Sequence, residues 1–306
     1  MNTSGRTVNG FALPLVLIIL ALLTALSFGL TRLVSANMQL LQERKTEWTE
    51  ELQLRDALEK AVHMLLVGKY DPKSVSLDSA SLPLNSAPAV INGLTVRVQS
   101  WSGLYSFSLL GYQNTNAVFR QMMDSKSAQR VSAELGDWID EDTRGRFRGG
   151  EGADYATRKM LQRPRNAPLR SIDELLELPS VTPDMMNGSG KTPGFRDLFL
   201  AGGEDNFDLG TAPDILVGPL LGLSGATARE VIEARKEADW SKVRFLIDEN
   251  HWVFNDHPAF YKGPNYRLEF ESKRGVTSRV QMKLTPYDPQ GLYAIIDWQV
   301  PDYPYE

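Results

Sequence analysis

An uncharged apolar run near the start of the chain constrains its fold more than any other feature. Residues 11–30 form a stretch of 20 positions without a charged side chain, and the polar leader before it carries one charge, Arg6. At ~1.5 Å per residue, a helix over this stretch is ~30 Å long, which matches the hydrocarbon core of a bilayer. The run therefore predicts one membrane-spanning helix.

The junction between Gly10 and Phe11 lies before the apolar run, whereas a secretory signal peptide is cut after its apolar core. This arrangement resembles the leader of type IV pilins and type II secretion pseudopilins, which a prepilin peptidase cuts after the glycine. The resemblance implies that the mature chain begins at Phe11, with methylation of that new terminus. The segment alone also fits an uncleaved signal anchor, or a signal peptide cut after Ala36.

The fifth residue of the mature chain would be Leu15, where most members of these families have glutamate. That carboxylate can pair with the N-terminal amine of a neighbouring subunit within the bilayer, where an uncompensated amine is costly. A subunit without it should dock poorly beneath another subunit, so we expect Leu15 to determine the position in a filament. Among these families, an apolar fifth residue is typical of the K-type minor pseudopilin of type II secretion.

Amphipathic spacing continues the predicted helix to about residue 67, where Gly68 and then Asp71-Pro72 supply a stop signal. The following residues, 71–92, are rich in Ser, Pro, Asn and Asp and are predicted as a loop. Strand patterns at 94–98 and 105–109 are predicted to form a hairpin through Ser102-Gly103.

Strand patterns lie on both sides of a mostly helical segment of about 150 residues. Since strands that flank an insertion can complete one sheet, the sequence predicts an α+β fold. The expected fold is a pilin-like long N-terminal transmembrane helix packed on an antiparallel sheet, with a large α-helical domain inserted between strands. K-type pseudopilins are built in this way. The later strands are predicted at 266–270, 276–284 and 293–300, and the predicted divisions are 1–10 (leader), 11–30 (transmembrane), 31–113 (helix and first strands), 114–262 (helical insert) and 263–306 (C-terminal strands).

Two short markers in the insert resemble the Asn-x-Asn-Thr-Ala-Pro element of that family. They are residues 114–117 and 206–213, and the second departs from the pattern at Asp208 and Gly210. A helix-turn-helix-like pattern follows each marker. The second pattern also resembles a DNA-binding helix-hairpin-helix, but acids outnumber bases around its turn at 222–224 and the chain has a net charge of −5. Because cations dominate DNA affinity, we interpret this hairpin as a packing device and expect no nucleic-acid partner.

The densest group of carboxylates lies in residues 137–155 and nearly matches a calcium-binding loop. Counted from Asp140, the pattern is broken at its fifth place by Arg144. K-type pseudopilins can hold calcium in such loops, and the resemblance implies a structural ion here. The alternative is a solvated acidic loop neutralised by its own arginines. The candidate ligands are Asp137, Asp140, Asp142, Glu151 and Asp154.

Catalysis is not expected. Asp140 and Glu151 are the best carboxylate pair for glycoside hydrolysis, but no other group of a substrate site accompanies them. Of the three histidines, His63 is far in sequence from His251 and His257, and the segment that holds these two looks like a turn instead of a metal site. Neither a nucleophile elbow nor a phosphate-binding loop is present. The chain has no cysteine, which excludes disulfides and thiol chemistry.

Taken with the resemblance, these patterns imply a minor pseudopilin at the tip of the type II secretion pseudopilus. The implied partners are the I-type and J-type minor pseudopilins, the prepilin peptidase and other secretion components. The implied location is the bacterial inner membrane, with a single span and the bulk of the chain in the periplasm. The alternatives are a minor pilin of a type IV pilus and a membrane-tethered DNA-binding protein of an uptake apparatus.

Overall fold

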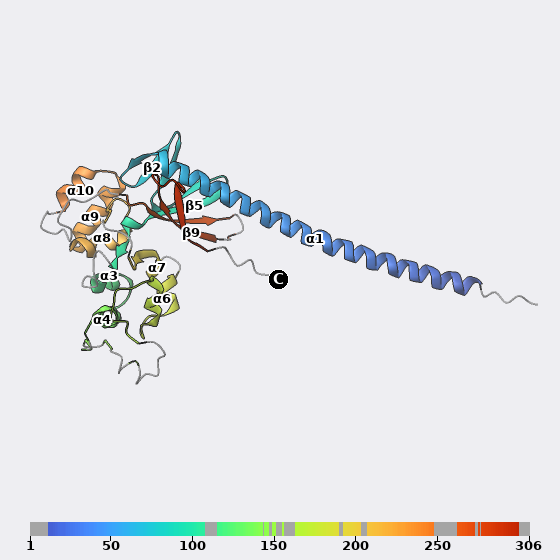
Figure 1. The fold of residues 1–306 in the computed structure, drawn as a ribbon, viewed down its shortest axis with the longest axis horizontal. Coiled ribbons are helices and arrows are strands. Elements are labelled where there is room, and N and C mark those ends of the chain that lie inside the picture. The colour runs from blue at the N-terminus through green and yellow to red at the C-terminus, as the bar shows by residue number, and fades with distance from the viewer. Residues whose placement is uncertain are drawn as a thin grey trace, which may run out of the picture. The chain divides into compact units, whose positions relative to one another are not determined.

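The computed structural model describes most of the chain, and its contacts divide the protein into two compact units, Met1–Asp56 and Ala57–Glu306. The first unit holds most of a long helix. The second holds the end of that helix, a five-stranded sheet and a group of shorter helices (Figure 1). The described residues are 12–107, 115–142, 144–146, 149–150, 155, 163–189, 192–202, 207–247, 262–272, 275 and 277–299.

The long helix, α1, runs from Ala12 to Val67 and is the one described helix that is long and apolar enough to cross a membrane. It ends where the sequence predicts. The N–H of Gly68 donates to Met64 O at 2.9 Å, and a Cβ on Gly68 would lie 2.5 Å from that oxygen. Only glycine therefore fits at this position without displacing the last helical turn.

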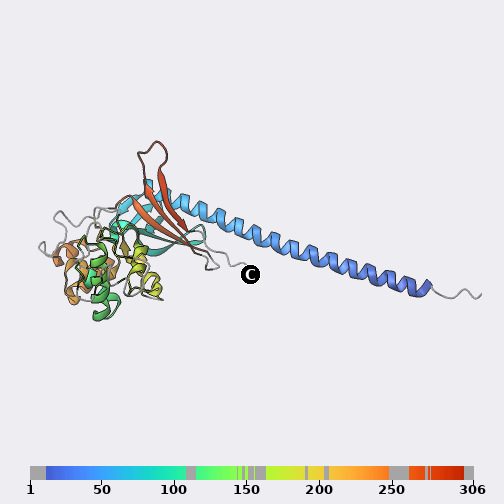
Figure 2. The same cartoon turned by 60° about the horizontal axis from the view of Figure 1, so that its bottom comes forward.

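The main sheet contains strands from both ends of the second unit, in the order β10-β9-β8-β5-β4, with every neighbouring pair antiparallel (Figure 2). The predicted α+β fold, with helices inserted between strands of one sheet, is confirmed. The three C-terminal strands are also confirmed, to within one residue at each end. The strands are β4 (Asn85–Ile91), β5 (Leu94–Ser100), β8 (Asn265–Glu271), β9 (Thr277–Leu284) and β10 (Tyr293–Gln299).

Two local predictions are wrong. The predicted loop at 71–92 contains strands, because its polar residues pair in a small sheet of order β1-β2-β3 and then in β4. The real hairpin joins β4 to β5 through Asn92-Gly93, where both residues have positive φ (51° and 82°), as a tight hairpin turn of the favoured twist requires. The small strands are β1 (Lys69–Asp71), β2 (Ser74–Leu77) and β3 (Ala80–Pro83).

The segment predicted as the second strand of that hairpin begins at Tyr105, and it instead connects the main sheet to the helical insert. After the short 3-10 helix η1 (Trp101–Gly103), strand β6 (Tyr105–Ser106) pairs in parallel with β7 (Phe199–Leu200), which lies in the helical insert. The chain therefore leaves the main sheet at η1 instead of turning back along it.

The two faces of the main sheet are chemically different, because side chains alternate along each strand. Val98, Leu268 and Val280 form a fully buried cross-strand row. This is the face toward α1, since the hydroxyl of Tyr70 donates to Leu65 O on α1 and lies 3.4 Å from the hydroxyl of Tyr266 on β8. The opposite face carries charged side chains and lies toward the insert (Figure 1).

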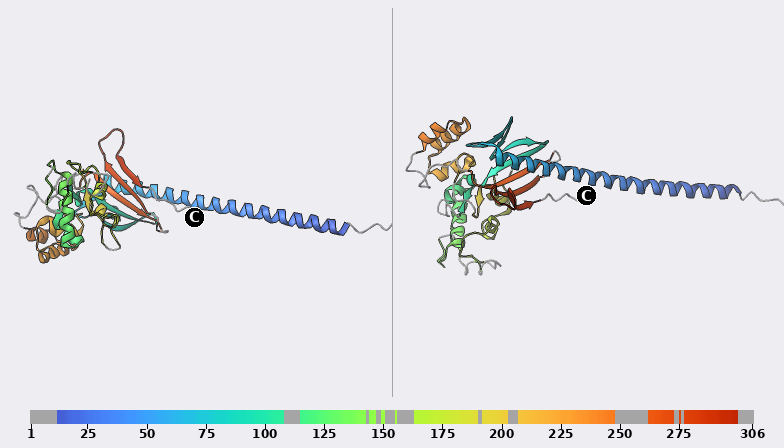
Figure 3. Two further views of the ribbon diagram at one scale, coloured as in Figure 1. Left: turned by 90° about the horizontal axis from the view of Figure 1, so that it is seen from below. Right: turned by 45° about the horizontal axis from the view of Figure 1, so that its top comes forward.

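The insert is built of short helices around one apolar core. Helices α8, α9 and α10 lie together at one side of it (Figure 3). An aromatic cluster packs the insert against β6, the strand that follows the main sheet. The ring centroid of Phe199 lies 5.5 Å from that of Tyr105 and 5.4 Å from that of Phe119. The elements are α3 (Thr115–Met122), α4 (Ser125–Ile139), η2 (Ile172–Glu177), α6 (Pro183–Asn187), α7 (Phe195–Leu198), α8 (Asp214–Leu221), α9 (Gly225–Lys236) and α10 (Trp240–Leu246).

Candidate functional site

The first part of α1 is a candidate assembly surface. Its large apolar side chains from Leu13 to Val34 are about half or more exposed, and Leu15 is 52% exposed. Helical residues 12–42 include no acidic residue, and Arg32 is their only charge. Such a surface needs lipid or other apolar helices around it. The predicted cleavage residues Gly10 and Phe11 lie outside the described part of the chain.

The acidic loop is organised around an arginine. Asp137 is fully buried, and its carboxylate accepts hydrogen bonds from the N–H of Gly150 (2.8 Å), the N–H of Arg146 (3.0 Å) and Arg146 Nη1 (2.9 Å). The same guanidinium contacts Asp140. Arg146 therefore supplies the positive charge at the place where the sequence predicts calcium.

As arranged, the described residues do not fit a calcium site. Both oxygens of Asp137 already accept N–H donors, and Asp142 Oδ1 accepts the N–H of Arg144 at 2.7 Å. Asp140 Oδ1 is the remaining buried oxygen, and it has no hydrogen-bond partner. Calcium needs six to eight oxygen ligands, and no described group of three or more acidic or histidine side chains could hold a metal. The other two candidate ligands, Glu151 and Asp154, lie outside the described residues, so calcium binding stays a prediction.

The hairpin between α8 and α9 turns tightly at Gly222, and its role as a packing device stays a prediction. Gly222 ends α8 in the left-handed conformation (φ 62°), and Ser224 caps α9 by accepting the N–H of Thr227. The base on α9 nearest to the core, Arg235, is 5% exposed and donates to Ala212 O at 2.5 Å. Its cation is directed into the protein, where burial lowers its pKa. This arginine is not available to a DNA phosphate.

Residues 207–213 of the second family marker form a buried junction that sequence reasoning did not recognise as a site. Asp208 is fully buried and accepts hydrogen bonds from the N–H of Gly210 and the hydroxyl of Thr211, both at 2.9 Å. Lys262 Nζ lies 3.3 Å from Asp208 and donates to Pro72 O at 2.6 Å. The marker therefore links the insert to the strands near residue 72 and to the start of β8.

Residues of the same junction also make hydrogen bonds with η1. The N–H of Asp208 donates to Ser102 O at 2.7 Å, and Ser102 Oγ accepts the N–H of Gly263 at 2.7 Å. A Cβ on Gly210 would lie 1.9 Å from Pro72 O. The two residues that depart from the family pattern are thus the two that this close packing requires. A sequence signal was present, since a carboxylate stands between buried apolar residues, but nothing in sequence pointed to Lys262.

The sequence candidates for catalysis are not brought together in the described chain. Asp140 is held by Arg146, and its proposed partner Glu151 lies outside the described residues. His251 and His257 also lie outside them. The described part of the chain thus offers no catalytic pair to evaluate.

Comparison with known proteins gives one family match, and it lies within the helical insert. Residues 113–188 match the model of a family described as "Type II secretion system (T2SS), protein K". No protein of curated function matches the sequence significantly.

The fold matches a chain of the crystal structure of the GspK-GspI-GspJ complex from the type 2 secretion system of enterotoxigenic Escherichia coli. The TM-score is 0.52 at 15% sequence identity, over 85% of this chain and 100% of that one. At this identity the likeness shows the fold, and the family match covers part of the helical insert. The chain is therefore similar to protein K of type II secretion over residues 113–188, and its fold is similar to that of a chain in the GspK-GspI-GspJ complex.

Proposed function

We propose that this chain is a minor pseudopilin of type II secretion that occupies the tip of the pseudopilus, where it nucleates or caps the filament and so supports protein export across the outer membrane. The observation that carries the proposal is the absence of a carboxylate from the stem. Between Ala12 and Gln42 the helix offers no acidic group, whichever residue begins the mature chain.

The physical argument is one of charge compensation. A subunit added below this one would place its N-terminal amine against the stem, and no carboxylate there could pair with it. Placing an uncompensated charge near the centre of a bilayer costs ~3 kcal/mol on insertion scales. The reverse arrangement carries no such cost, since this chain's own amine can pair with a carboxylate of the subunit below. The chain is therefore suited to the end of a filament and poorly suited to its shaft.

The further parts of the proposal rest on the likeness to protein K of type II secretion. The partners would be the I-type and J-type minor pseudopilins, because the matching fold was determined in a complex of that composition. A prepilin peptidase would cut between Gly10 and Phe11, and the new N-terminus would be methylated. The stem would anchor the chain in the bacterial inner membrane, with the second unit in the periplasm. Because pseudopilins are structural proteins, the likeness to this family supports the expectation that the chain is not an enzyme. The same likeness does not favour a minor pilin of a type IV pilus or a DNA-uptake protein.

Labelling of isolated pseudopili tests the position directly. Filaments from cells that express an epitope-tagged chain are decorated with gold-labelled antibody and examined by electron microscopy. Label at one end of each filament is the expected result. The variant Leu15→Glu should add label along the shaft, because its carboxylate can accept the amine of a subunit below.

A matched control separates charge from polarity. Leu15→Gln has nearly the same shape as Leu15→Glu but no charge, and it should leave the label at the end. Label along the shaft of wild-type filaments would overturn the proposal. So would equal behaviour of the glutamate and glutamine variants, since the argument depends on the charge.

A further inference from the structure

A buried arginine lies on the central strand of the main sheet, on the face toward the insert. Arg267 pairs with Gln99 on one side and Gln281 on the other, and the next row holds Arg97, Glu269 and Arg279. Arg267 is 7% exposed. A guanidinium at this depth normally has a carboxylate or several carbonyl oxygens around it.

The Nε of Arg267 is buried without a hydrogen-bond partner among the described residues, and no salt bridge joins its guanidinium to any of them. The nearby carboxylates serve Arg279 instead, whose Nη2 lies 2.6 Å from Glu269 and 3.8 Å from Asp197. Burial and the adjacent charge of Arg279 lower the pKa of Arg267 to about 10. Asp197 and Glu269 favour the charged form of Arg267 and oppose this shift only in part, so Arg267 is a buried cation whose nearest carboxylates are ion-paired with Arg279.

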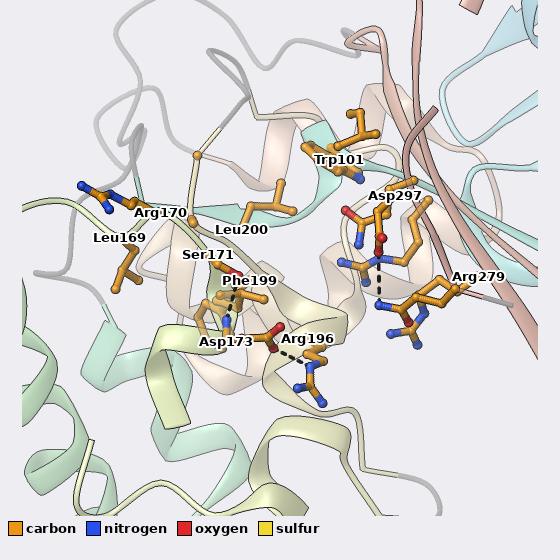
Figure 4. Close-up of a pocket in the computed structure, with 17 residues that line it drawn as sticks. Trp101, Leu169, Arg170, Ser171, Asp173, Arg196, Phe199, Leu200, Arg279 and Asp297 are labelled. Atoms are coloured by element: carbon orange, nitrogen blue, oxygen red, sulfur yellow. Dashed lines mark hydrogen bonds and ion pairs between the residues drawn. The ribbon is translucent and has the colours of Figure 1, made fainter. Parts of the chain in front are cut away.

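Arg267 is one of the residues that line a pocket of about 460 Å³ between the sheet and the insert. Figure 4 shows this pocket. Arg170 lines it too, and within the described chain no carboxylate pairs with the Arg170 side chain. Arg196 is already paired with Asp173 at 2.7 Å. A second donor also lacks a partner here, because the indole N–H of Trp101 is buried and makes no hydrogen bond. The described side chains that line this pocket thus include four arginines and two aspartates, which is an excess of positive charge.

The lining also restricts the kind of anion. Leu169, Phe199 and Leu200 supply apolar surface beside the arginines. An inorganic anion would leave that surface in contact with water, whereas an organic acid would cover it. Asp297 lines the same pocket, and its negative charge weakens the binding of any anion there. Within the described residues, its side chain accepts a hydrogen bond from Gln299 alone.

We propose that this pocket binds a carboxylate group attached to an apolar body, with Arg267 as the principal cation. A carboxylate can receive two parallel N–H donors from one guanidinium, which is the geometry that such a pair favours. The group could belong to a free organic acid or to an acidic side chain of a bound protein segment, since both present the same chemistry. The inference does not depend on the position of the chain in a filament.

Calorimetric titration of the full-length chain in detergent micelles tests the proposal with defined probes. Glutarate represents a free acid, and the peptide acetyl-Leu-Glu-Leu-amide represents an acidic side chain. Acetyl-Leu-Gln-Leu-amide and sulfate are the controls for charge and for the carboxylate. Binding of glutarate alone assigns a free acid, binding of the Glu peptide alone assigns a protein segment, and binding of both supports the shared chemistry.

Three variants locate the site. Arg267→Met keeps most of the side-chain volume and should weaken binding at least tenfold. Asp297→Asn removes the opposing charge and should tighten binding severalfold. Arg229→Gln, on the exposed side of α9, should leave the affinity unchanged. Asp297→Asn also keeps the test decisive if Arg267→Met fails to fold, because its effect has the opposite sign.

Thermal unfolding gives an independent readout. Without ligand, Arg267→Met should unfold at the wild-type temperature or above, since it removes an unsatisfied buried charge. Glutarate or the Glu peptide should raise the unfolding temperature of the wild type and not that of the variant. The proposal is overturned if neither carboxylate binds, if sulfate or the Gln peptide binds equally well, or if Arg267→Met binds like the wild type.

Discussion

Removal of the Asp208 carboxylate is the most informative perturbation of the junction. Asp208→Ala leaves the ammonium group of Lys262 in a site where its side chain is 7% exposed, with Pro72 O as the remaining acceptor among the described residues. It also deprives the N–H of Gly210 and the hydroxyl of Thr211 of their acceptor. The substitution therefore combines an unpaired buried charge with two unsatisfied buried donors.

The expected cost follows from these contacts. Breaking a buried ion pair by removing one partner costs ~3–5 kcal/mol. For a folded unit of the size of Ala57–Glu306, each kcal/mol lowers the unfolding temperature by ~2–4 °C. Asp208→Ala should therefore lower that temperature by ~6–20 °C.

The pair itself should add little to stability. Burial raises the pKa of Asp208 despite the nearby Lys262, and burial lowers the pKa of Lys262 despite Asp208. Both directions mean that the charged forms lose more from burial than they gain from each other. The double variant Asp208→Ala/Lys262→Met should thus cost less than Asp208→Ala alone, because no buried charge is then left unpaired.

Urea unfolding followed by tryptophan fluorescence measures the free energy of unfolding of Asp208→Ala, Lys262→Met and the double variant in a double-mutant cycle. The matched control is the surface ion pair of Lys236 and Glu233, whose atoms are 2.7 Å apart but whose side chains are 58% and 63% exposed. Glu233→Ala should cost less than ~1 kcal/mol. A similar small cost for Asp208→Ala, or a double variant that costs the sum of the two single ones, would refute the reasoning.

Three further predictions concern other contacts. Gly210→Ala should lower the free energy of unfolding by ~3 kcal/mol, because its Cβ would lie 1.9 Å from Pro72 O. Gly225→Ala is the control and should not lower it, because the space around Gly225 is open. Urea unfolding of both variants measures the difference. Arg146→Ala should make the unfolding temperature rise more with millimolar calcium than that of the wild type does, since the substitution frees carboxylates that Arg146 holds in the wild type. Unfolding temperatures of both proteins with and without calcium test this, and an equal response contradicts it.

Hydrogen bonds from the Ser127 side chain and backbone lower the pKa of Asp124, which caps α4. Its contribution is therefore present above the ordinary carboxyl pKa and is lost as the pH falls through the lower, folded value. Asp124→Ala should flatten the loss of stability on acidification, as measured by unfolding at a series of pH values, and an unchanged acid limb would contradict this.

The sequence predicted those parts of the fold that local patterns determine. The apolar period of α1 and its stop at Gly68 are both local, as are the alternating strands near the C-terminus. The hairpin at Asn92-Gly93 was also readable, because this dipeptide is a strong turn signal, but the polar composition of 71–92 obscured the strands on its N-terminal side. Polar strands of this kind are stabilised by pairing with neighbours, which composition does not report.

The functional contacts were less predictable, because their partners are distant in sequence. Asp208 and Lys262 are separated by more than fifty residues, and Arg267 depends on a pocket between two parts of the fold. The acidic loop shows the limit most clearly. Its carboxylates matched a calcium pattern, yet Arg146, which the sequence offered only as a neutralising charge, takes the central position among Asp137 and Asp140.

The junction also bears on how the insert could act at a filament tip. Contacts join the insert to the sheet at β6, at the marker around Asp208 and before β8 at Lys262, and each of these is a backbone or a buried polar contact. Three ties across one boundary fix an orientation, whereas a single linker would leave the insert free to rotate. A partner bound to the insert would then be held in a defined position relative to the sheet. Assembly of a tip complex would gain from this rigidity, because less orientational freedom is lost when the partners associate.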